Sequence, residues 1–187
     1  LKLPATIGTA GQVLKNSSTA GTLEFGSTGI TVADQWHLDD DEEVSSGEYI
    51  DNGWLRSADD TTGWGGIGSA MTESSGVFTF PSTGIYRITF YAQGFSSSTE
   101  MDWVYARING TTNNFTSTNT LVEGYSNTGN ASGNVYAQIT CDTLFDVTDT
   151  SNRKIKVWAQ ANTGTWTLHS SSGASRTHII FTRLGDT

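Results

Sequence analysis

The densest set of groups able to do chemistry in this sequence is a run of five consecutive carboxylates, Asp39-Asp40-Asp41-Glu42-Glu43. Adjacent carboxylates repel one another unless water solvates them or a cation bridges them, and a hard cation such as calcium prefers oxygen ligands of this kind. The run lacks the alternate spacing and the glycine of a known calcium loop. We therefore expect a solvated acidic loop, with a calcium site at Asp39, Asp40 and Asp41 as the alternative.

Groups suited to catalysis are few and scattered. Glu100 and Asp102 are two residues apart on an expected strand, where they share a face as the paired carboxylates of a glycosidase do, although surface charges often have this spacing. No nucleophile elbow, zinc-protease motif, phosphate loop or dinucleotide fingerprint is present. The three histidines fall on expected strands or strand ends and are predicted to be structural: His37, His169 and His178. We predict that the protein is not an enzyme and uses no cofactor.

Composition and charge exclude several other classes of protein. The net charge is −9 and the ten basic residues are scattered, whereas nucleic-acid binding depends on clustered Lys and Arg. No apolar run approaches the ~18–20 residues of a membrane span. Cys141 is the single cysteine, so we expect a buried free thiol and no disulfide within the chain. We predict neither nucleic-acid binding nor membrane insertion. Because the sequence does not begin with Met, we also expect further residues upstream of Leu1.

Aromatic residues near expected loops form the candidate ligand site. A ring beside Asn, Asp and Ser suits the C–H face and the hydroxyls of a sugar. The candidates are Trp54, Trp64, Phe115, Tyr125 and Trp166. The alternative is that these rings fill the ends of a sandwich or an interface between subunits.

The elements that position these residues are predicted to be strands. After the turn at 81–84, alternate residues share one face of an extended segment: Tyr86, Ile88, Phe90 and Ala92. Both faces of this segment are largely apolar, which is typical of a central strand. No segment has a helical period, and about ten short strands are separated by turn signals. The sequence therefore predicts an all-β, two-sheet jelly-roll sandwich.

The residues from Gly76 to Phe90 also carry a family resemblance. Their pattern, G-x-F-x-F-P-x-x-G-x-Y-x-I-x-F, resembles the signature of the C1q/TNF-like jelly roll, with Ile88 where the family usually has phenylalanine. Members are ten-stranded jelly rolls that assemble as homotrimers, usually at the end of a stalk. By position, the resemblance implies core or trimer-axis roles for Tyr86, Ile88 and Phe90, and a turn role for Gly84. The chain has no collagen-like repeat and lacks the family's S-F-S-G-F ending, which favours a bacterial or viral branch.

Residues 1–33 are predicted to form a stem or attachment segment, with the jelly-roll head at 34–187. Two short apolar pieces flank the polar stretch 16–21, which indicates a hairpin too small to be stable alone. A copy of the hairpin from another chain would supply the missing neighbour. The stretch Gly8-Thr9-Ala10-Gly11-Gln12-Val13-Leu14 resembles segments that recur in tail fibres and other virion proteins of bacteriophages. The alternative is a linker rich in Gly and Thr.

These observations predict a structural protein on the virion surface. Its expected form is a homotrimeric head of a phage tail fibre or spike, which contacts other virion proteins and binds a host receptor or glycan. Two alternatives stand beside it: a capsid decoration (cement) trimer, and a secreted C1q-like recognition or lectin module. The segment at 8–14 favours a virion protein, whereas a signal peptide upstream would favour the secreted module.

Overall fold

The computed structural model describes residues 1–187 except 10, 28, 60–62, 97–101, 129–132 and 171–173. The chain divides into two compact units, Leu1–Thr31 and Val32–Thr187, which are described separately. Among the described residues, the helical structure is one 3-10 turn, Ser57–Asp59. No helix in this part of the chain is long and apolar enough to cross a membrane.

The first unit is an antiparallel hairpin of β1 (Gln12–Asn16) and β2 (Leu23–Ser27), as the two apolar pieces predict. A single hairpin has no second layer to cover its apolar side chains. Val13 and Leu14 are accordingly 44% and 45% exposed, and Ile7 in the preceding segment is 94% exposed. The unit therefore carries more exposed apolar surface than its small size can bury.

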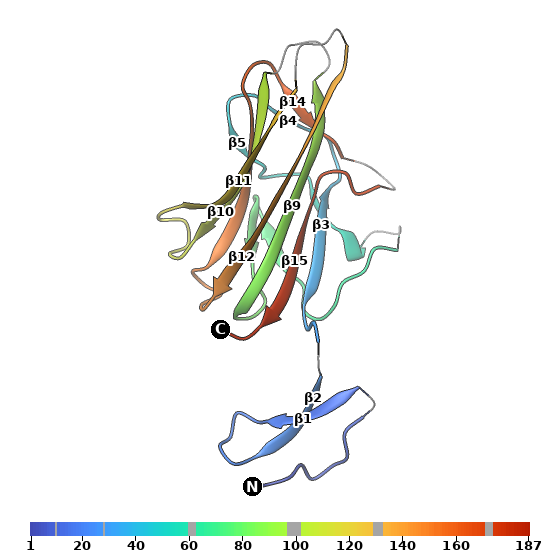
Figure 1. The fold of residues 1–187 in the computed structure, drawn as a ribbon, viewed down its shortest axis with the longest axis vertical. Helices are drawn as coiled ribbons and strands as arrows, with labels where there is room; N and C mark the ends of the chain where they lie inside the picture. The colour runs from blue at the N-terminus through green and yellow to red at the C-terminus, as the bar shows by residue number, and fades with distance from the viewer. Residues whose placement is uncertain (10, 28, 60–62, 97–101, 129–132, 171–173) are drawn as a thin grey trace. The chain divides into compact units, whose positions relative to one another are not determined.

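The second unit is a sandwich of two sheets (Figure 1). The strands of the first sheet are β5 (Glu48–Tyr49), β7 (Thr72–Ser74), β8 (Val77–Thr79), β10 (Trp103–Thr111), β11 (Asn119–Asn127) and β13 (Lys154–Ala161). Those of the second are β3 (Ala33–Leu38), β4 (Glu42–Val44), β6 (Trp54–Arg56), β9 (Gly84–Ser96), β12 (Val135–Val147), β14 (Trp166–Leu168) and β15 (His178–Gly185). The six-stranded sheet has the order β11-β10-β13-β8-β7, with β5 on β13. The seven-stranded sheet has the order β4-β14-β9-β15-β3-β6, with β12 on β9. The predicted jelly-roll sandwich is confirmed.

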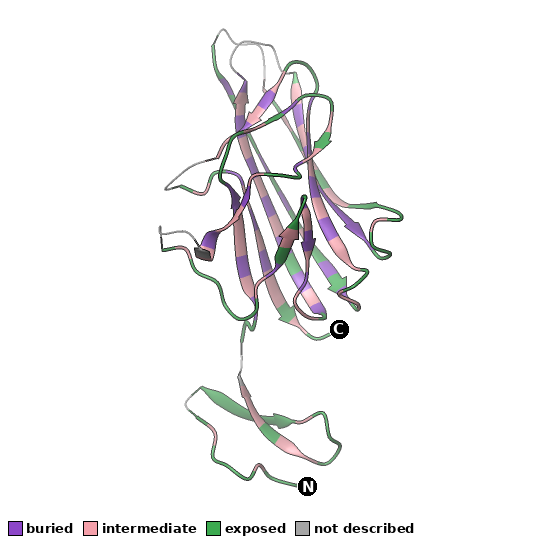
Figure 2. Ribbon diagram, turned by 180° about the vertical axis from the view of Figure 1, so that it is seen from behind, coloured by how far each residue is buried: buried purple, intermediate pink, exposed green. Residues whose placement is uncertain are grey.

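Strand β9 is the centre of the seven-stranded sheet. It pairs with β12 over its whole length and with β15 and β14 on its other side. Its side chains alternate between the interior and the outer face, as Figure 2 shows by the change of colour along the strands. Tyr86, Ile88 and Phe90 are completely buried between the two sheets. The structure thus corrects the trimer-axis role that the resemblance allowed them: they are core residues of one chain, with no surface left for another.

Aromatic rings fill much of the interior. Phe78 lies against three of them, with ring centroids 5.8 Å from Trp36, 5.3 Å from Trp54 and 5.3 Å from Phe181. All four rings belong to strands that the jelly-roll order brings together from distant parts of the chain. Edge-on and tilted contacts of this kind add to the stabilisation that burial provides.

The turn that leads into β9 depends on Gly84. Its φ of +143° is one that side-chain-bearing residues rarely adopt, and a Cβ there would overlap the Arg183 guanidinium and the Gly185 carbonyl oxygen. The turn role predicted for Gly84 follows from both constraints.

Candidate functional site

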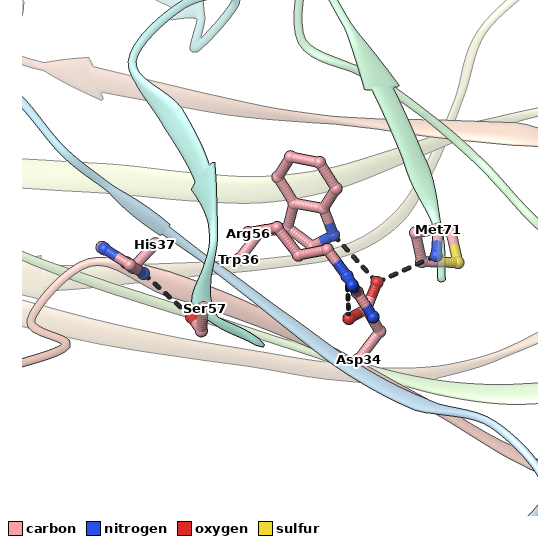
Figure 3. A network of polar contacts seen from close by, with 6 residues as sticks. All are labelled: Asp34, Trp36, His37, Arg56, Ser57 and Met71. Carbon is pink, nitrogen blue, oxygen red and sulfur yellow. Dashed lines mark hydrogen bonds and ion pairs between the residues drawn. The ribbon is translucent and has the colours of Figure 1, made fainter. Parts of the chain in front are cut away.

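A buried carboxylate on β3 joins this strand to the end of β6 and to the segment between β6 and β7 (Figure 3). Asp34 accepts hydrogen bonds from Arg56 Nε at 2.8 Å and from Trp36 Nε1 at 3.1 Å. A third comes from the backbone N–H of Met71 at 2.8 Å. A buried charge is tolerated when it is both paired and hydrogen-bonded, and Asp34 meets both conditions. The network is a structural anchor that holds this segment against the edge of the sheet.

His37 and Ser57 form a serine–histidine contact, with Nδ1 and Oγ 2.9 Å apart (Figure 3). Contacts of this kind activate nucleophiles in hydrolases. Here His37 is 1% exposed and Ser57 is 0% exposed, and the ring of Trp64 packs edge-on over the imidazole at 4.7 Å between centroids. A substrate therefore has no access to the hydroxyl. His37 is structural, as predicted, and Trp64, a predicted ligand residue, instead covers it.

The carboxylates of the acidic run have separate partners. Asp41 Oδ1 accepts hydrogen bonds from the backbone N–H and the hydroxyl of Ser170, at 2.7 Å and 2.9 Å. Partial burial opposes ionisation of Asp41, but these bonds outweigh it and hold the pKa of the carboxyl below its usual value. In β4, partial burial and two nearby carboxylates raise the pKa of Glu42. No group of three or more His, Cys, Asp or Glu in the described part of the chain is placed to hold a metal ion, so the calcium alternative gains no support.

The relative position of Glu100 and Asp102, the pair considered for glycoside hydrolysis, is not described, because Glu100 lies outside the described residues. Asp102 accepts a hydrogen bond from Asn162 Nδ2 at 3.1 Å, close to the start of β10. This bond joins two loops at the same end of the six-stranded sheet, an ordinary surface role for the carboxylate.

Two of the aromatic residues predicted to bind a ligand lie in the core. Trp166 is completely buried, and Trp54 is 9% exposed with its Nε1–H donated to the carbonyl of Ile50 at 2.9 Å. The ring of Trp54 also contacts Phe78 and Phe90 inside the sandwich. The prediction for these two residues is corrected: their rings are not available at the surface of the chain, and they fill the interior as the alternative held.

The remaining two candidates are on the outer side of the six-stranded sheet but in different places. Tyr125 on β11 is 69% exposed, and its ring lies 5.7 Å from that of Tyr105 on β10. With Trp103 and Asn127 they line a surface hollow of about 310 Å³. Phe115, on the loop after β10, borders a separate hollow of about 410 Å³. The structure thus brings none of the five predicted residues together in one site.

Sequence reasoning missed Trp103 and Tyr105. Both alternate outward along β10, and Arg107 continues the row with its guanidinium 5.3 Å from the Tyr105 ring centroid and 4.3 Å from that of Trp158. The signal that predicts this row is the two-residue spacing of large side chains from 103 to 107, because such residues share one face of a strand.

The outer surface of the seven-stranded sheet is a third candidate, called here the open face and viewed in Figure 1. It consists of outward side chains of β9, β12 and β15, among them Arg87, Thr89, Tyr91, Tyr136, Gln138, Asp142, Leu144 and His178. Many of these side chains form hydrogen bonds with one another within the chain. Asp142 accepts hydrogen bonds from the Arg87 guanidinium, the shortest at 2.8 Å, and from Thr89 Oγ1 at 2.9 Å. The bond from Arg87 is the main reason that the pKa of Asp142 is lowered.

Aromatic and imidazole rings stack on the same face. His178 stacks on Tyr91 with 5.2 Å between centroids, and His169 stacks on Phe95 at 4.6 Å. Tyr136 continues the second stack and is itself 62% exposed, and Leu144 further along β12 is 61% exposed. Apolar groups are thus exposed on a surface whose nearest charges are already paired.

No protein-family model matches the sequence, and no curated protein matches it. Solved structures do match. The chain is similar to Eiger TNF from S. frugiperda, with a TM-score of 0.59 and 14% identity over 85% of this chain and 96% of that chain. It is also similar to murine APRIL at pH 5.0, with a TM-score of 0.55 and 16% identity over 81% of this chain and 99% of that chain. The chain has a TNF-like jelly-roll fold. The resemblance carried by residues 76–90 is therefore confirmed at the level of the fold.

Proposed function

We propose that this chain is a non-enzymatic binding head that assembles as a homotrimer and is carried on a virion. The open face is the observation that supports assembly. Tyr136 and Leu144 expose 62% and 61% of their surface there, while Arg87 and Asp142 neutralise each other at 2.8 Å within the chain. A face with exposed apolar groups and few unpaired charges has the composition of an interface between subunits.

The resemblance of residues 76–90 to the C1q/TNF-like signature adds a reason for three subunits rather than two. An obligate interface of this kind buries on the order of 2,000 Å² or more. Static light scattering on the purified chain at micromolar concentration tests the assembly. The expected mass is three times the 20.0 kDa of one chain. A clean monomer would exclude the homotrimer.

The first unit supports attachment to a larger particle. Its hairpin leaves Val13 and Leu14 nearly half exposed, and three copies around an axis would cover these side chains together with Leu23 and Phe25. The stretch from Gly8 to Leu14 resembles segments of phage tail fibres, which supports a stem that joins the head to a fibre. Three linked heads also increase the avidity of a weak binding site without any new contact.

Electron microscopy of virions tests where the chain is carried. A gold label on the second unit should give density at fibre tips. Density over capsid faces would instead indicate a capsid decoration trimer. The TNF-like fold also supports a secreted recognition module, since the similar solved structures include Eiger TNF and murine APRIL. Absence of the label from purified virions, with the chain in the surrounding medium, would favour the secreted recognition module.

A further inference from the structure

A hollow of about 410 Å³ lies on the outer side of the six-stranded sheet, where β7, β8 and β13 are neighbours. The strand register places Thr72 beside Thr79, and Thr79 beside Lys154. Residues two positions away on each strand share this face: Ser74, Val77 and Lys156. The loop after β10 supplies a wall made of Asn114 and Phe115. We call it the lysine hollow, because Lys154 and Lys156 both line it.

The charge of the lysine hollow is opposite to that of the protein. Lys154 and Lys156 are the two lysines of Val32–Thr187, in a chain whose net charge is −9. Lys154 Nζ donates a hydrogen bond to Asn114 Oδ1 at 2.6 Å. Lys156 Nζ lies 5.1 Å from the ring centroid of Tyr49 and 5.3 Å from that of Phe115.

Neither ammonium group is in an ion pair with a described residue. Four of the six arginines of the same unit differ in this respect, since each of them pairs with a carboxylate: Arg56, Arg87, Arg107 and Arg183. Glu73 is the acidic residue of the lining, and its Oε1 accepts a hydrogen bond from the Gly76 N–H at 2.7 Å in the β7–β8 turn. Two positive charges therefore face the hollow without a carboxylate partner.

Hydrogen bonds within the chain position the loop that forms one wall of the hollow. Buried Thr111 accepts hydrogen bonds at Oγ1 from the N–H groups of Asn113 and Phe115, at 3.2 Å and 2.9 Å. Among the described residues, every non-glycine residue with a positive φ lies in or beside the lining: Ser75, Asn114 and Phe115. Such backbone persists only where surrounding contacts determine it, and it is concentrated at functional sites. A preformed wall also reduces the entropy that binding must offset.

We propose that the lysine hollow binds an acidic sugar, with the carboxylate of the sugar between Lys154 and Lys156. Lysine ammonium groups bind carboxylates through charge-assisted hydrogen bonds. The Phe115 ring offers an apolar face to the C–H groups of the sugar ring. Hydroxyl groups on the floor are placed to exchange hydrogen bonds with those of the sugar: Thr72, Ser74 and Thr79. The volume is within the range of small-ligand pockets.

This inference rests on the proposed binding role but not on the proposed assembly, because all lining residues belong to one chain. The first measurement is a calorimetric titration of the full chain with glucuronic acid, glucose and inorganic phosphate. Glucuronate should bind at least about tenfold more tightly than glucose, because the charged hydrogen bonds are lost with the neutral sugar. Its affinity should fall as sodium chloride is added, since salt screens the two lysines.

Matched variants locate the binding. The Lys154→Gln/Lys156→Gln variant should lose at least about tenfold in glucuronate affinity. Lys2→Gln/Lys15→Gln removes the same charge from the first unit and should bind as the natural chain does. Phe115→Ala should weaken the binding of glucuronate and leave the binding of phosphate unchanged. Melting temperatures show whether each variant folds. If the double variant does not fold, Lys156→Gln alone replaces it.

Three results would overturn the proposal. The first is an absence of glucuronate binding, or equal binding of glucuronate and glucose. The second is an equal loss in the variants of the hollow and in the first-unit control. The third is that phosphate binds as tightly as glucuronate and that no variant changes the binding of phosphate. Light scattering on the same samples separates these results from a failure of trimer formation.

Discussion

Cys141 on β12 donates its thiol hydrogen to the carbonyl oxygen of Ala106 on β10, with Sγ and O 3.3 Å apart across the interior of the sandwich. It is the buried free thiol that a single cysteine predicts. Burial raises the pKa of Cys141 to about 11, so the reactive thiolate is scarce near neutral pH. We expect no reaction of the native protein with a thiol reagent such as DTNB, and complete reaction after unfolding in guanidinium. Rapid labelling of folded protein would contradict the buried position.

His178, which stacks on Tyr91, should make the protein less stable in acid because it is partly buried. Burial is the main reason that the pKa of His178 is lowered, and His37, opposite it in the β3–β15 register, adds to the effect. Backbone hydrogen bonds act in the other direction but do not outweigh it. A histidine with a lowered pKa in the folded state takes up its proton more readily when unfolded. Its contribution to stability is therefore present above the unfolded pKa of about 6.5 and is lost as the pH falls through that value.

The measurement is the melting temperature as a function of pH. It should fall as the pH is lowered from about 7 to about 5, and the fall should be smaller in His178→Phe, which keeps a ring on Tyr91 and has no proton to bind. An identical pH dependence in the variant and the natural chain would show that His178 is not the group responsible.

Much of the fold is predictable because strand periodicity is a local property. The alternation along Gly84–Ser96 and Lys154–Ala161 is visible in the sequence and has the faces that the structure shows. The expectation of about ten strands is too low, since Val32–Thr187 contains thirteen among its described residues. Short edge strands account for the difference, β5 (Glu48–Tyr49) having two residues and β6 (Trp54–Arg56) three. Their pairing is decided by the neighbouring strand rather than by their own pattern.

The candidate sites were less predictable, because a surface is assembled from distant segments. Trp166 is followed and preceded by threonine, which fits either a loop or a short strand, and only the folded structure shows that its ring is buried. Lys154 and Lys156 visibly share a face of one strand. The wall opposite them comes from Asn114 and Phe115, about 40 positions earlier, and no local pattern connects the two.

Asp34→Asn should destabilise the second unit by about 3 kcal/mol, since it removes the buried negative charge that pairs with Arg56. An asparagine keeps the shape but can no longer balance the charge, and its NH₂ group cannot accept from Trp36 or Met71. Urea unfolding followed by tryptophan fluorescence measures the difference. Asp102→Asn, at an exposed carboxylate, is the control and should change the stability by less than about 0.5 kcal/mol. Equal midpoints for the two variants would refute the role given to Asp34.

Phe90→Asp should prevent folding. Phe90 is completely buried, and its ring contacts Trp54 at 6.5 Å between centroids. An unpaired carboxylate in such a site costs at least several kcal/mol, which is comparable with the whole stability of a domain. Circular dichroism and solubility report the result. Thr120→Asp introduces the same charge at an exposed position of β11 and should fold normally. A folded Phe90→Asp protein with an unchanged melting temperature would show that the inward face of β9 is misassigned.

The open face should be the surface through which three chains associate. Leu144→Arg and Tyr136→Arg place a charge on side chains that are 61% and 62% exposed, so each variant should fold as a monomer. Association should fail because the added guanidinium would be desolvated in the interface without a partner. Tyr125→Arg is the matched control, since Tyr125 is 69% exposed but lies on the opposite sheet. Light scattering should give one chain mass for the open-face variants and three for the control. If Tyr125→Arg dissociates the trimer while Leu144→Arg and Tyr136→Arg remain trimeric, the subunits associate through the six-stranded sheet instead.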